Sequence, residues 1–284
     1  MIFAYLGPRD AMPPAPRYSW MEGPSKNRFV YEHVQENCNY LQALEGGLDS
    51  AHVGILHGDE MALATIGQYD PNGVGADRYP TTDHAPRLEI ETTDYGFVYA
   101  AIRQASDEGK RYVRITPYVM PFMTFPAMRS CVMRLPQDDT TTVTISVSYN
   151  ASTPPDGRFI LERQGMGTPE TYGPDRILRV PAQDRAAMEA RRSFTGWDGF
   201  NIQDGAMTMY MGGPILDRTK EHVVPTDFAI LRMRRLLLQI ADQVERGERP
   251  IGTGPTVDTS SVAGASGIIG DGESWRDLLD HAVG

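Results

Sequence analysis

Two histidines lie five residues apart in the stretch "CNYLQALEGGLDSAHVGILHG", residues 38–58. A pair of imidazoles is a ligand set that Fe, Zn, Cu and Ni accept. Residues five apart on one α-helix are offset by about 140°, so His52 and His57 can reach one ion only if the helix ends or bulges between them. Gly54 and Gly58 make such a break plausible. Taken alone, however, the pair is a weak signal for a metal, and two ordinary buried or surface histidines are the more frequent explanation.

Carboxylates near helix ends supply the other candidate residues. Asp49 precedes His52 by one helical turn, where its side chain could orient the imidazole by a hydrogen bond, as a metal-binding histidine requires. A third ligand must come from elsewhere in the chain. Asp227 stands in the first turn of a long predicted helix, and on composition alone it is a favourable charge near a helix N-terminus.

The elements that must position these residues predict an α+β domain. Five consecutive runs with the composition of strands are bounded by turn residues, and the first of them alternates apolar with polar residues, which is typical of an antiparallel sheet. These runs are "RLEIETT", "FVYAAIRQ", "RYVRITPYVM", "RSCVMRLP" and "TTTVTISVSYN". One long helix follows in "PTDFAILRMRRLLLQIADQVERG", whose apolar residues recur on one face.

Other segments are predicted with less regular patterns. Residues 31–57 are expected to be helical in part, with an interruption at Gly46-Gly47. Residues 59–86 predict a long loop of the kind that can cover a pocket. The stretch 182–192 predicts a surface helix, and "DGAMTMYMG" (204–212) predicts a further strand.

Composition excludes several function classes. The net charge of -10 over 284 residues opposes binding to nucleic acid or to an anionic membrane surface. No run of about 18 apolar residues is present, and the start lacks the pattern of a secretory signal. Two cysteines, Cys38 and Cys131, suit a reducing compartment. We therefore expect a cytoplasmic protein with neither a nucleic-acid nor a membrane partner.

Several blocks of the chain resemble one family. "CNYLQALEGGLDSAHVGILH" is similar to the mononuclear-iron motif of Rieske-type non-haem iron oxygenases, the α subunits of aromatic-ring-hydroxylating dioxygenases, in their phthalate dioxygenase-like branch. The resemblance continues through about residues 2–250, in the order of the family. Its further blocks are "FAYLGP", "PPAPRY", "YGFVYAAIR", "YVRITPYVMPFMTFP", "LPQDDTTTVTISVSY" and "MGGPILDRTKEHVVPTDFAILRMRRLLLQ".

The resemblance implies a fold and a metal site. The fold would be of the helix-grip (START-like) type, a curved antiparallel sheet around a long C-terminal helix. His52 and His57 match the two histidine ligands of a mononuclear Fe(II), and we expect Asp227 to be the carboxylate ligand. Asp49 matches the bridging aspartate of the family, which is thought to connect the iron to the Rieske cluster of a neighbouring subunit.

One feature of the family is missing from these residues. The C-x-H and C-x2-H ligands of a Rieske centre are absent, because neither cysteine has a histidine two or three residues later. A [2Fe-2S] cluster is therefore implied but not bound by this chain. Since "MIFAYLGP" opens inside a predicted strand, we expect the later part of a longer protein. Residues 1–30 would be the remnant of a linker from a Rieske domain, 31–250 the catalytic domain, and 251–284 a flexible Gly/Ser-rich tail.

The implied partners are an aromatic substrate and dioxygen, a Rieske domain or its polypeptide, and an NAD(P)H-dependent reductase, with a homotrimer as the full-length form. The isolated chain is expected to bind iron but not to turn over. The proline-rich segment 8–27 should be extended and wrap the domain. Candidate pocket walls are Met120, Phe122, Phe125 and Phe200, although ordinary core packing is the more frequent role for each of them.

Alternative functions share part of this pattern. Oxidative O-demethylation uses the same iron site and would differ in how the substrate is held. A binding module of the helix-grip fold could hold a hydrophobic ligand without catalysis, although it would have no need of the three metal-type residues. A zinc hydrolase is disfavoured because no H-E-x-x-H pattern occurs. An acidic substrate would require an arginine at the pocket, and the sequence does not indicate which one.

Overall fold

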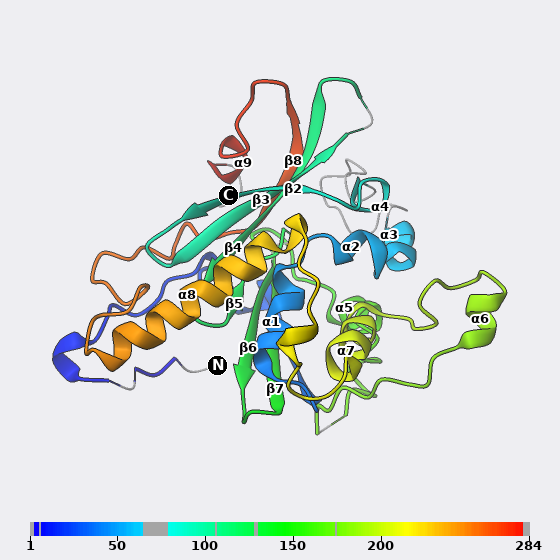
Figure 1. Ribbon diagram of the computed structural model, residues 1–284, viewed down its shortest axis with the longest axis horizontal. Coiled ribbons are helices and arrows are strands. Elements are labelled where there is room, and N and C mark those ends of the chain that lie inside the picture. The colour runs from blue at the N-terminus through cyan, green and yellow to red at the C-terminus, as the bar shows by residue number, and fades with distance from the viewer. Residues whose placement is uncertain are drawn as a thin grey trace.

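The computed structural model describes residues 3–5, 7–64, 79–105, 107–127, 130–173 and 175–280. In that part of the chain, one antiparallel sheet of eight strands runs in the order β1-β7-β6-β5-β4-β3-β2, with β8 paired to β4 (Figure 1). The strands are β1 Arg28–Glu36, β2 Arg87–Thr92, β3 Gly96–Gln104, β4 Lys110–Val119, β5 Met123–Thr124, β6 Ser130–Pro136, β7 Thr141–Tyr149 and β8 Ala265–Gly270.

The long helix and the helices beside it cover one face of this sheet, while the short C-terminal helix packs with Trp275 on the other face. The α-helices are α1 Tyr40–Leu48, α2 His52–Ile55, α3 Gly58–Ala64, α4 Tyr79–Thr82, α5 Gly157–Arg163, α6 Arg185–Glu189, α7 Phe200–Tyr210, α8 Phe228–Glu245 and α9 Asp277–Asp280. Figure 1 shows the long helix α8 lying across the sheet, with α1 beside it. The predicted helix-grip architecture, a curved antiparallel sheet around a long C-terminal helix, is confirmed.

The apolar face of α8 explains where this helix lies. Ala229, Met233 and Leu236 recur at helical spacing and are buried against residues of β3, β4 and α1, among them Phe97 and Leu44. The same side of β3 and β4 therefore faces both α8 and α1. This contact fixes α1, whose C-terminal end leads directly to the histidine pair.

The five predicted strand runs correspond to β2, β3, β4, β6 and β7, and this part of the sheet is confirmed. Three strands, β1, β5 and β8, were not predicted. Residues 28–36 form β1, although residues from 31 onward were expected to be partly helical. The alternation in β1 is hidden because its buried positions include the polar residues His33 and Gln35, which a search for apolar periodicity passes over.

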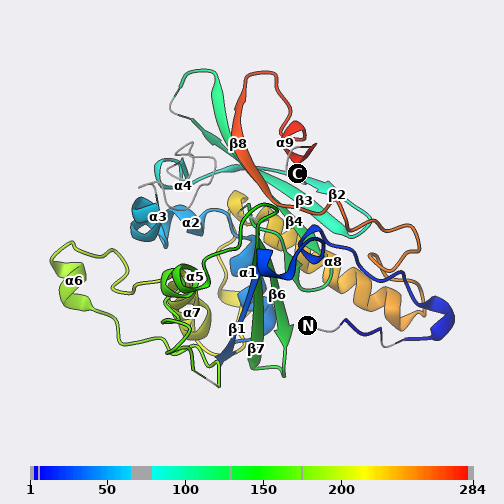
Figure 2. The same ribbon diagram turned by 180° about the vertical axis from the view of Figure 1, so that it is seen from behind.

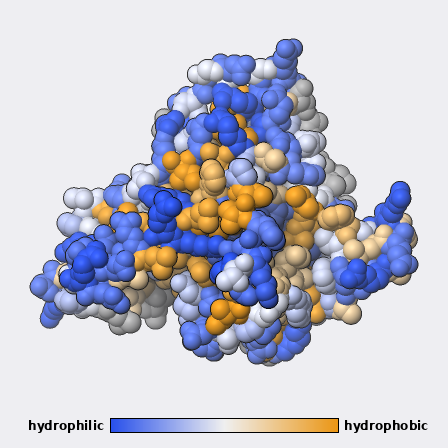
Figure 3. Space-filling view, viewed as in Figure 1, coloured by the Kyte–Doolittle hydropathy of each residue, from blue (hydrophilic) through white to orange (hydrophobic). Residues whose placement is uncertain are grey.

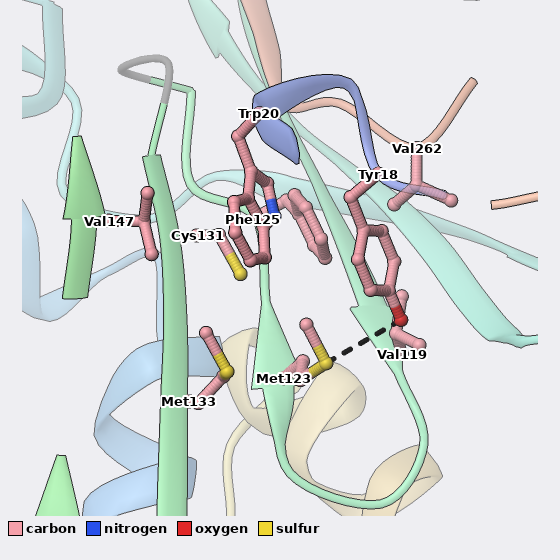
Figure 4. Packing of buried hydrophobic residues seen from close by; sticks show 9 residues of the cluster. All are labelled: Tyr18, Trp20, Val119, Met123, Phe125, Cys131, Met133, Val147 and Val262. Carbon is pink, nitrogen blue, oxygen red and sulfur yellow. Dashed lines mark hydrogen bonds between the residues drawn. The ribbon is translucent and has the colours of Figure 1, made fainter. Parts of the chain in front are cut away.

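The opposite face of the sheet is covered by irregular chain. Residues 8–27, predicted as an extended wrapping segment, contain no strand and include three short 3-10 helices, Arg9–Ala11, Ser19–Met21 and Ser25–Asn27. From this segment Tyr18 and Trp20 enter an apolar cluster with Met123 and Phe125, and the Tyr18 hydroxyl donates to Met123 Sδ at 3.6 Å (Figure 4). Figure 2 shows this N-terminal segment on the rear of the sheet.

The segment 251–284 differs from the flexible tail that was predicted. Residues 265–270 pair with residues 110–115 of β4, and Trp275 is buried against the outer face of β3 and β4. The prediction of a flexible tail is therefore wrong for the strand and for Trp275, because apolar burial follows the Gly/Ser-rich stretch. Residues 281–284 lie outside the described residues. The other domain boundaries stay predictions.

No helix among the described residues has the length and apolar character needed to cross a lipid bilayer.

Candidate functional site: a histidine and aspartate cluster

The two histidines are placed by a break between short helices. Helix α1 ends at Leu48, α2 spans His52–Ile55, and α3 begins at Gly58, so His57 lies in the turn between α2 and α3. The predicted break between His52 and His57 is confirmed. It brings the two imidazole rings to a centroid separation of 5.0 Å at 75° to one another.

Helix α1 is not interrupted at Gly46-Gly47, so that prediction is wrong. The physical reason for a glycine here is a close approach across the molecule. A Cβ atom at Gly47 would collide with the guanidinium of Arg134, which reaches α1 from β6. The absence of a side chain at Gly47 therefore leaves room for the Arg134 guanidinium against α1, and the helix continues through this residue.

A third side chain completes the cluster. Asp204 of α7 places its Oδ1 3.0 Å from His57 Nε2 and 3.6 Å from His52 Nε2. Among the described residues, His52, His57 and Asp204 form the group whose donor atoms all lie within 4.8 Å of one another. Two imidazole nitrogens and one carboxylate oxygen are the donor set that non-haem Fe(II) accepts as a facial triad.

Hydrogen bonds orient both imidazoles toward this point. His52 Nδ1 lies 2.5 Å from the backbone oxygen of Asp49, and His57 Nδ1 lies 2.7 Å from Gln203 Oε1. The Gln203 amide donates to the Trp197 carbonyl at 2.9 Å, which leaves its oxygen as an acceptor for the His57 N–H. Each Nδ1 is thus a donor to its oxygen partner, and each Nε2 faces Asp204, where it can ligate a metal once it carries no proton. This is the outer arrangement that metal-binding histidines require, so the residues fit a divalent metal.

The electrostatics of the cluster are strongly coupled. Burial would raise the pKa of Asp204, but the charge and hydrogen bond of His57, together with His52 and Arg134, lower this pKa to about 2. Burial would lower the pKa of His57, but Asp204 and the hydrogen bond that His57 donates to Gln203 outweigh it and raise the pKa. Burial lowers the pKa of His52 despite the nearby Asp204. The carboxylate is therefore ionised, and one of the two imidazoles is held neutral.

Asp227 does not join this cluster. It ends the 3-10 turn Pro225–Asp227 before α8, and its Oδ2 accepts a hydrogen bond from the backbone N–H of Val224 at 2.9 Å. The carboxylate beside the two histidines is thus Asp204, whereas the Asp227 side chain closes the turn before α8. Asp204 was missed because residues 204–212 were predicted to be a strand, whereas residues 204–210 belong to helix α7.

Asp49 lies beside the cluster but contacts it differently from the expectation. Its backbone oxygen, and not its carboxylate, receives the His52 N–H; the carboxylate Oδ2 is 3.8 Å from His52 Nδ1. The other carboxylate oxygen accepts from the N–H of Ala51 at 2.7 Å and closes the turn after α1. The Asp49 side chain is 26% exposed, so it remains open to a neighbour.

A cavity of about 200 Å³ adjoins the cluster on the side of the sheet. We call its polar wall the sheet floor, defined by residues of β1, β4, β6 and β7 that share one face: His33, Arg114, Thr116, Arg134, Thr144 and Ser146. In strand register, His33 pairs with Thr144, which pairs in turn with Arg134. Burial and the nearby Arg134 lower the pKa of His33 to about 4, so its ring is neutral at neutral pH.

Arg114 and Arg134 therefore line the cavity. The sequence alone did not indicate which arginines would lie at the pocket. Arg114 is 7% exposed, and no ion pair of either Arg114 or Arg134 occurs in the described part of the chain. Of the four candidate wall residues, Phe200 lines the cavity, with its ring 4.8 Å from the His57 ring. Met120, Phe122 and Phe125 pack in the apolar clusters instead.

A second hollow reaches the cluster from outside. This outer groove of about 860 Å³ shares Asp49, His52 and Asp204 with the cavity. Its other lining residues are largely apolar and come from α2, α7, the loop before α8 and the arm of residues 180–198. Exposed members are Ile55, Phe194, Met207, Met211 and Val223. Figure 3 shows apolar side chains gathered over the middle of this face of the molecule.

Fold and cluster together define the class: a helix-grip domain with a two-histidine, one-carboxylate cluster between its sheet and its helices. A model of the family described as "LigXa C-terminal domain like" matches residues 4–283. The chain therefore belongs to the LigXa C-terminal domain-like family.

Three relatives are oxygenase subunits. The chain is 33% identical to the phthalate 4,5-dioxygenase oxygenase subunit of Pseudomonas putida, with 99% of this chain and 66% of the relative covered. It is 27% identical to the 3-chlorobenzoate-3,4-dioxygenase oxygenase subunit of Comamonas testosteroni, covering 84% and 59%. It is 25% identical to the 5,5'-dehydrodivanillate O-demethylase oxygenase subunit of a Sphingobium species, covering 88% and 52%. The expected resemblance to phthalate dioxygenase-like oxygenase subunits is confirmed, and the chain spans between about half and two thirds of these relatives.

Proposed function

We propose that residues 31–250 are the catalytic domain of a Rieske-type oxygenase component that hydroxylates a carboxylated aromatic substrate at a mononuclear Fe(II). The observation that carries this proposal is the convergence of His52 Nε2, His57 Nε2 and Asp204 Oδ1 within 4.8 Å beside a cavity. When bound by such a donor set, Fe(II) supplies open coordination positions at which dioxygen is activated.

The chain's own residues prepare this site in three ways. The Asp49 carbonyl and the Gln203 amide hold the imidazole tautomers so that both Nε2 atoms are free to ligate. Asp204 is ionised because its pKa is about 2. Because the pKa of His57 is raised, loading of the site would release a proton from this imidazole.

The cavity favours an acidic aromatic substrate. A buried guanidinium is costly unless an anion or several hydrogen bonds compensate it, and Arg114 lines the cavity without an ion pair among the described residues. A ring carboxylate would supply the counter-charge and fix the distance of the ring from the cluster. Phthalate and 3-chlorobenzoate, named in two of the relatives, are aromatic carboxylates.

The electrons must arrive from outside these residues. Cys38 and Cys131 lie in separate apolar clusters and cannot together hold a [2Fe-2S] centre. In this proposal a Rieske domain, supplied with electrons from NAD(P)H by a reductase, docks at the outer groove, and in the full-length homotrimer it belongs to a neighbouring subunit. Asp49 is the natural contact, because its carboxylate borders both the groove and His52.

Two alternative functions remain, a non-catalytic binding module and an oxidative O-demethylase. The metal-type cluster distinguishes the first from the proposal, and the substrate distinguishes the second. A non-catalytic binding module has no need of three converging ligands, so the cluster favours the oxygenase. Oxidative O-demethylation would use the same residues, and one relative carries that name. We propose ring hydroxylation first because the two most similar relatives considered above are named as dioxygenases.

Anaerobic Fe(II) binding tests the proposal. Metal analysis after gel filtration should find about one iron per chain in the unaltered protein and none in His52→Ala. His222→Ala is the matched control, because His222 lines the outer groove but lies outside the cluster, and it should retain iron. Absence of iron in the unaltered chain, a preference for zinc, or iron retained in His52→Ala would each contradict the proposed site.

A further inference from the structure

Glu60 is a buried acid that the cluster itself does not use. It stands on α3 three residues after His57, and its exposed fraction is 7%. Its Oε1 accepts the backbone N–H of Gly199 at 2.6 Å, and its Oε2 accepts from Arg163 Nη1 at 3.0 Å. Arg163 also donates to the Glu60 carbonyl at 2.6 Å. One carboxylate thus connects α3, α5 and the beginning of α7.

The beginning of α7 has no capping side chain of its own. Gly199 is the N-cap residue, with φ +93°, and a Cβ atom there would collide with the backbone of Gly165. The close contact with Gly165 excludes the serine or aspartate that usually caps a helix. An acid from a different helix therefore satisfies the exposed N–H and complements the positive end of the helix.

The position of this N-terminus decides where the carboxylate of the cluster lies. Gln203 and Asp204 follow Gly199 by four and five residues, and both contact His57, at 2.7 Å and 3.0 Å. The segment 57–60 and the segment 199–204 are therefore bonded at two places, with Glu60 at one and His57 at the other. Between them lies the ring of Phe200, 4.8 Å from the His57 ring and 5.1 Å from Arg163 Cζ.

We propose that Glu60 is a positioning residue for the metal site: it fixes the start of α7 and thereby holds Asp204 and Gln203 in register with His57. This inference rests on the proposed function of the cluster. Glu60 touches none of the ligating atoms and acts through the backbone of Gly199. Arg163 holds the carboxylate in place through its two hydrogen bonds.

The test is metal affinity, not turnover. Fe(II) dissociation constants are measured anaerobically by competition with a chelator, and Co(II) replaces iron for visible spectroscopy. Glu60→Ala should weaken Fe(II) binding roughly 10- to 100-fold, the range found for outer partners of metal ligands, and should alter the Co(II) absorption bands. Glu60→Gln keeps an acceptor for Gly199 but not for Arg163, so its loss should be smaller and in the same direction.

Glu162→Gln is the matched control. Glu162 lies on α5, and its side chain is half-exposed. Among the described residues its ion-pair partner is Arg158, at 3.7 Å. Glu162→Gln should bind Fe(II) within twofold of the unaltered chain. If Glu60→Ala fails to fold, Glu60→Gln alone decides.

The outcomes separate this inference from the proposed function. If both Glu60 variants lower the melting temperature of the metal-free protein but keep its Fe(II) affinity and Co(II) spectrum, Glu60 is merely structural and the inference is overturned. If His52→Ala loses iron and both Glu60 variants bind it unchanged, the proposed function is retained and the inference about Glu60 is overturned. No iron in the unaltered chain would overturn both.

Discussion

Asp204 and Asp227 stand near the starts of two neighbouring helices and differ completely in their surroundings. Asp204 lies one turn inside α7 and faces two imidazoles, with Arg134 on the sheet floor beyond them. Asp227 ends the turn before α8 and accepts the N–H of Val224. One carboxylate is bound to side chains that can share a metal, and the other to its own backbone.

The difference shows what makes a carboxylate functional in this fold. A helix start offers backbone N–H groups, and an acid that satisfies them is an ordinary stabilising feature worth about 1 kcal/mol. Asp204 lies five residues after the N-cap residue Gly199, too far into α7 to cap its N-terminus, and the Gly199 N–H is satisfied by Glu60 instead. The Asp204 side chain therefore contacts the two histidines, whereas the Asp227 side chain bonds to its own backbone. The residue type alone does not distinguish these two environments.

Replacing each aspartate by asparagine is the most direct way to break this comparison. Asp204→Asn removes the negative charge and one ligand oxygen while preserving shape. We expect Fe(II) affinity to fall by roughly a thousandfold, about 4 kcal/mol, measured anaerobically by competition with a chelator.

Asp227→Asn is its counterpart at the start of α8. Because asparagine caps helices nearly as well as aspartate, iron affinity should stay within twofold and the free energy of unfolding should change by less than about 1 kcal/mol. Iron lost from Asp227→Asn and retained by Asp204→Asn would reverse the comparison and restore the ligand expected from the sequence.

The free energy of unfolding should also depend on pH through His33, which lines the same cavity as Asp204. Its folded pKa of about 4 is lower than the ordinary value of 6.5, so the unfolded chain binds more protons between these values. The neutral ring is therefore accommodated above pH 6.5, and stability falls as the pH decreases toward 4, by about 3 kcal/mol from this group. Urea unfolding at pH 7 and pH 4.5 should show a smaller pH dependence in His33→Asn than in the unaltered chain.

His222→Asn serves as the control on the surface side, because His222 is exposed near Asp227. Its unfolding should follow that of the unaltered chain at both pH values. Equal pH dependence in His33→Asn and the unaltered chain would show that the sheet floor accommodates the protonated imidazole.

The hydrogen bond between Gln203 and His57 provides the finest test of the comparison between Asp204 and Asp227. Gln203 accepts the His57 N–H, a contact without equivalent beside Asp227. Gln203→Leu should leave the His57 ring free to rotate or to change tautomer, and should weaken Fe(II) binding about tenfold. Gln183→Leu, on the arm beside the groove, is the control. Unchanged affinity in Gln203→Leu would mean that packing against Phe200 suffices to hold the ring.

The sequence carried much of the fold and two thirds of the cluster. The runs that form β2, β3, β4, β6 and β7 are recognised by their composition and the turn residues that bound them, and the apolar face of α8 follows from side-chain periodicity. His52 and His57 were found because they lie in one short stretch. The break that brings them together could be anticipated from Gly54 and Gly58 flanking the second histidine.

The remainder depended on contacts between distant segments. The alternation in "MTMY" favours a strand, yet these residues complete α7, whose start is fixed by Glu60, 139 residues earlier in the chain. Local propensity could not contain that information. The strand β1 was hidden for a related reason, because His33 and Gln35 are buried polar residues of the sheet floor. In both cases the pattern failed where the domain builds its site.

The cavity and the outer groove share a wall made of Gly46, Asp49, His52, Asp204 and Thr208. Residues on the two sides come from different parts of the chain, with sheet strands on one and helices and the loop before α8 on the other. Mutations of the sheet floor can therefore change which compound is accommodated without altering the surface presented to a partner. Under the proposed function, substitutions on the cavity side can thus change the substrate while the docking surface of the electron donor is preserved, because few residues line both hollows.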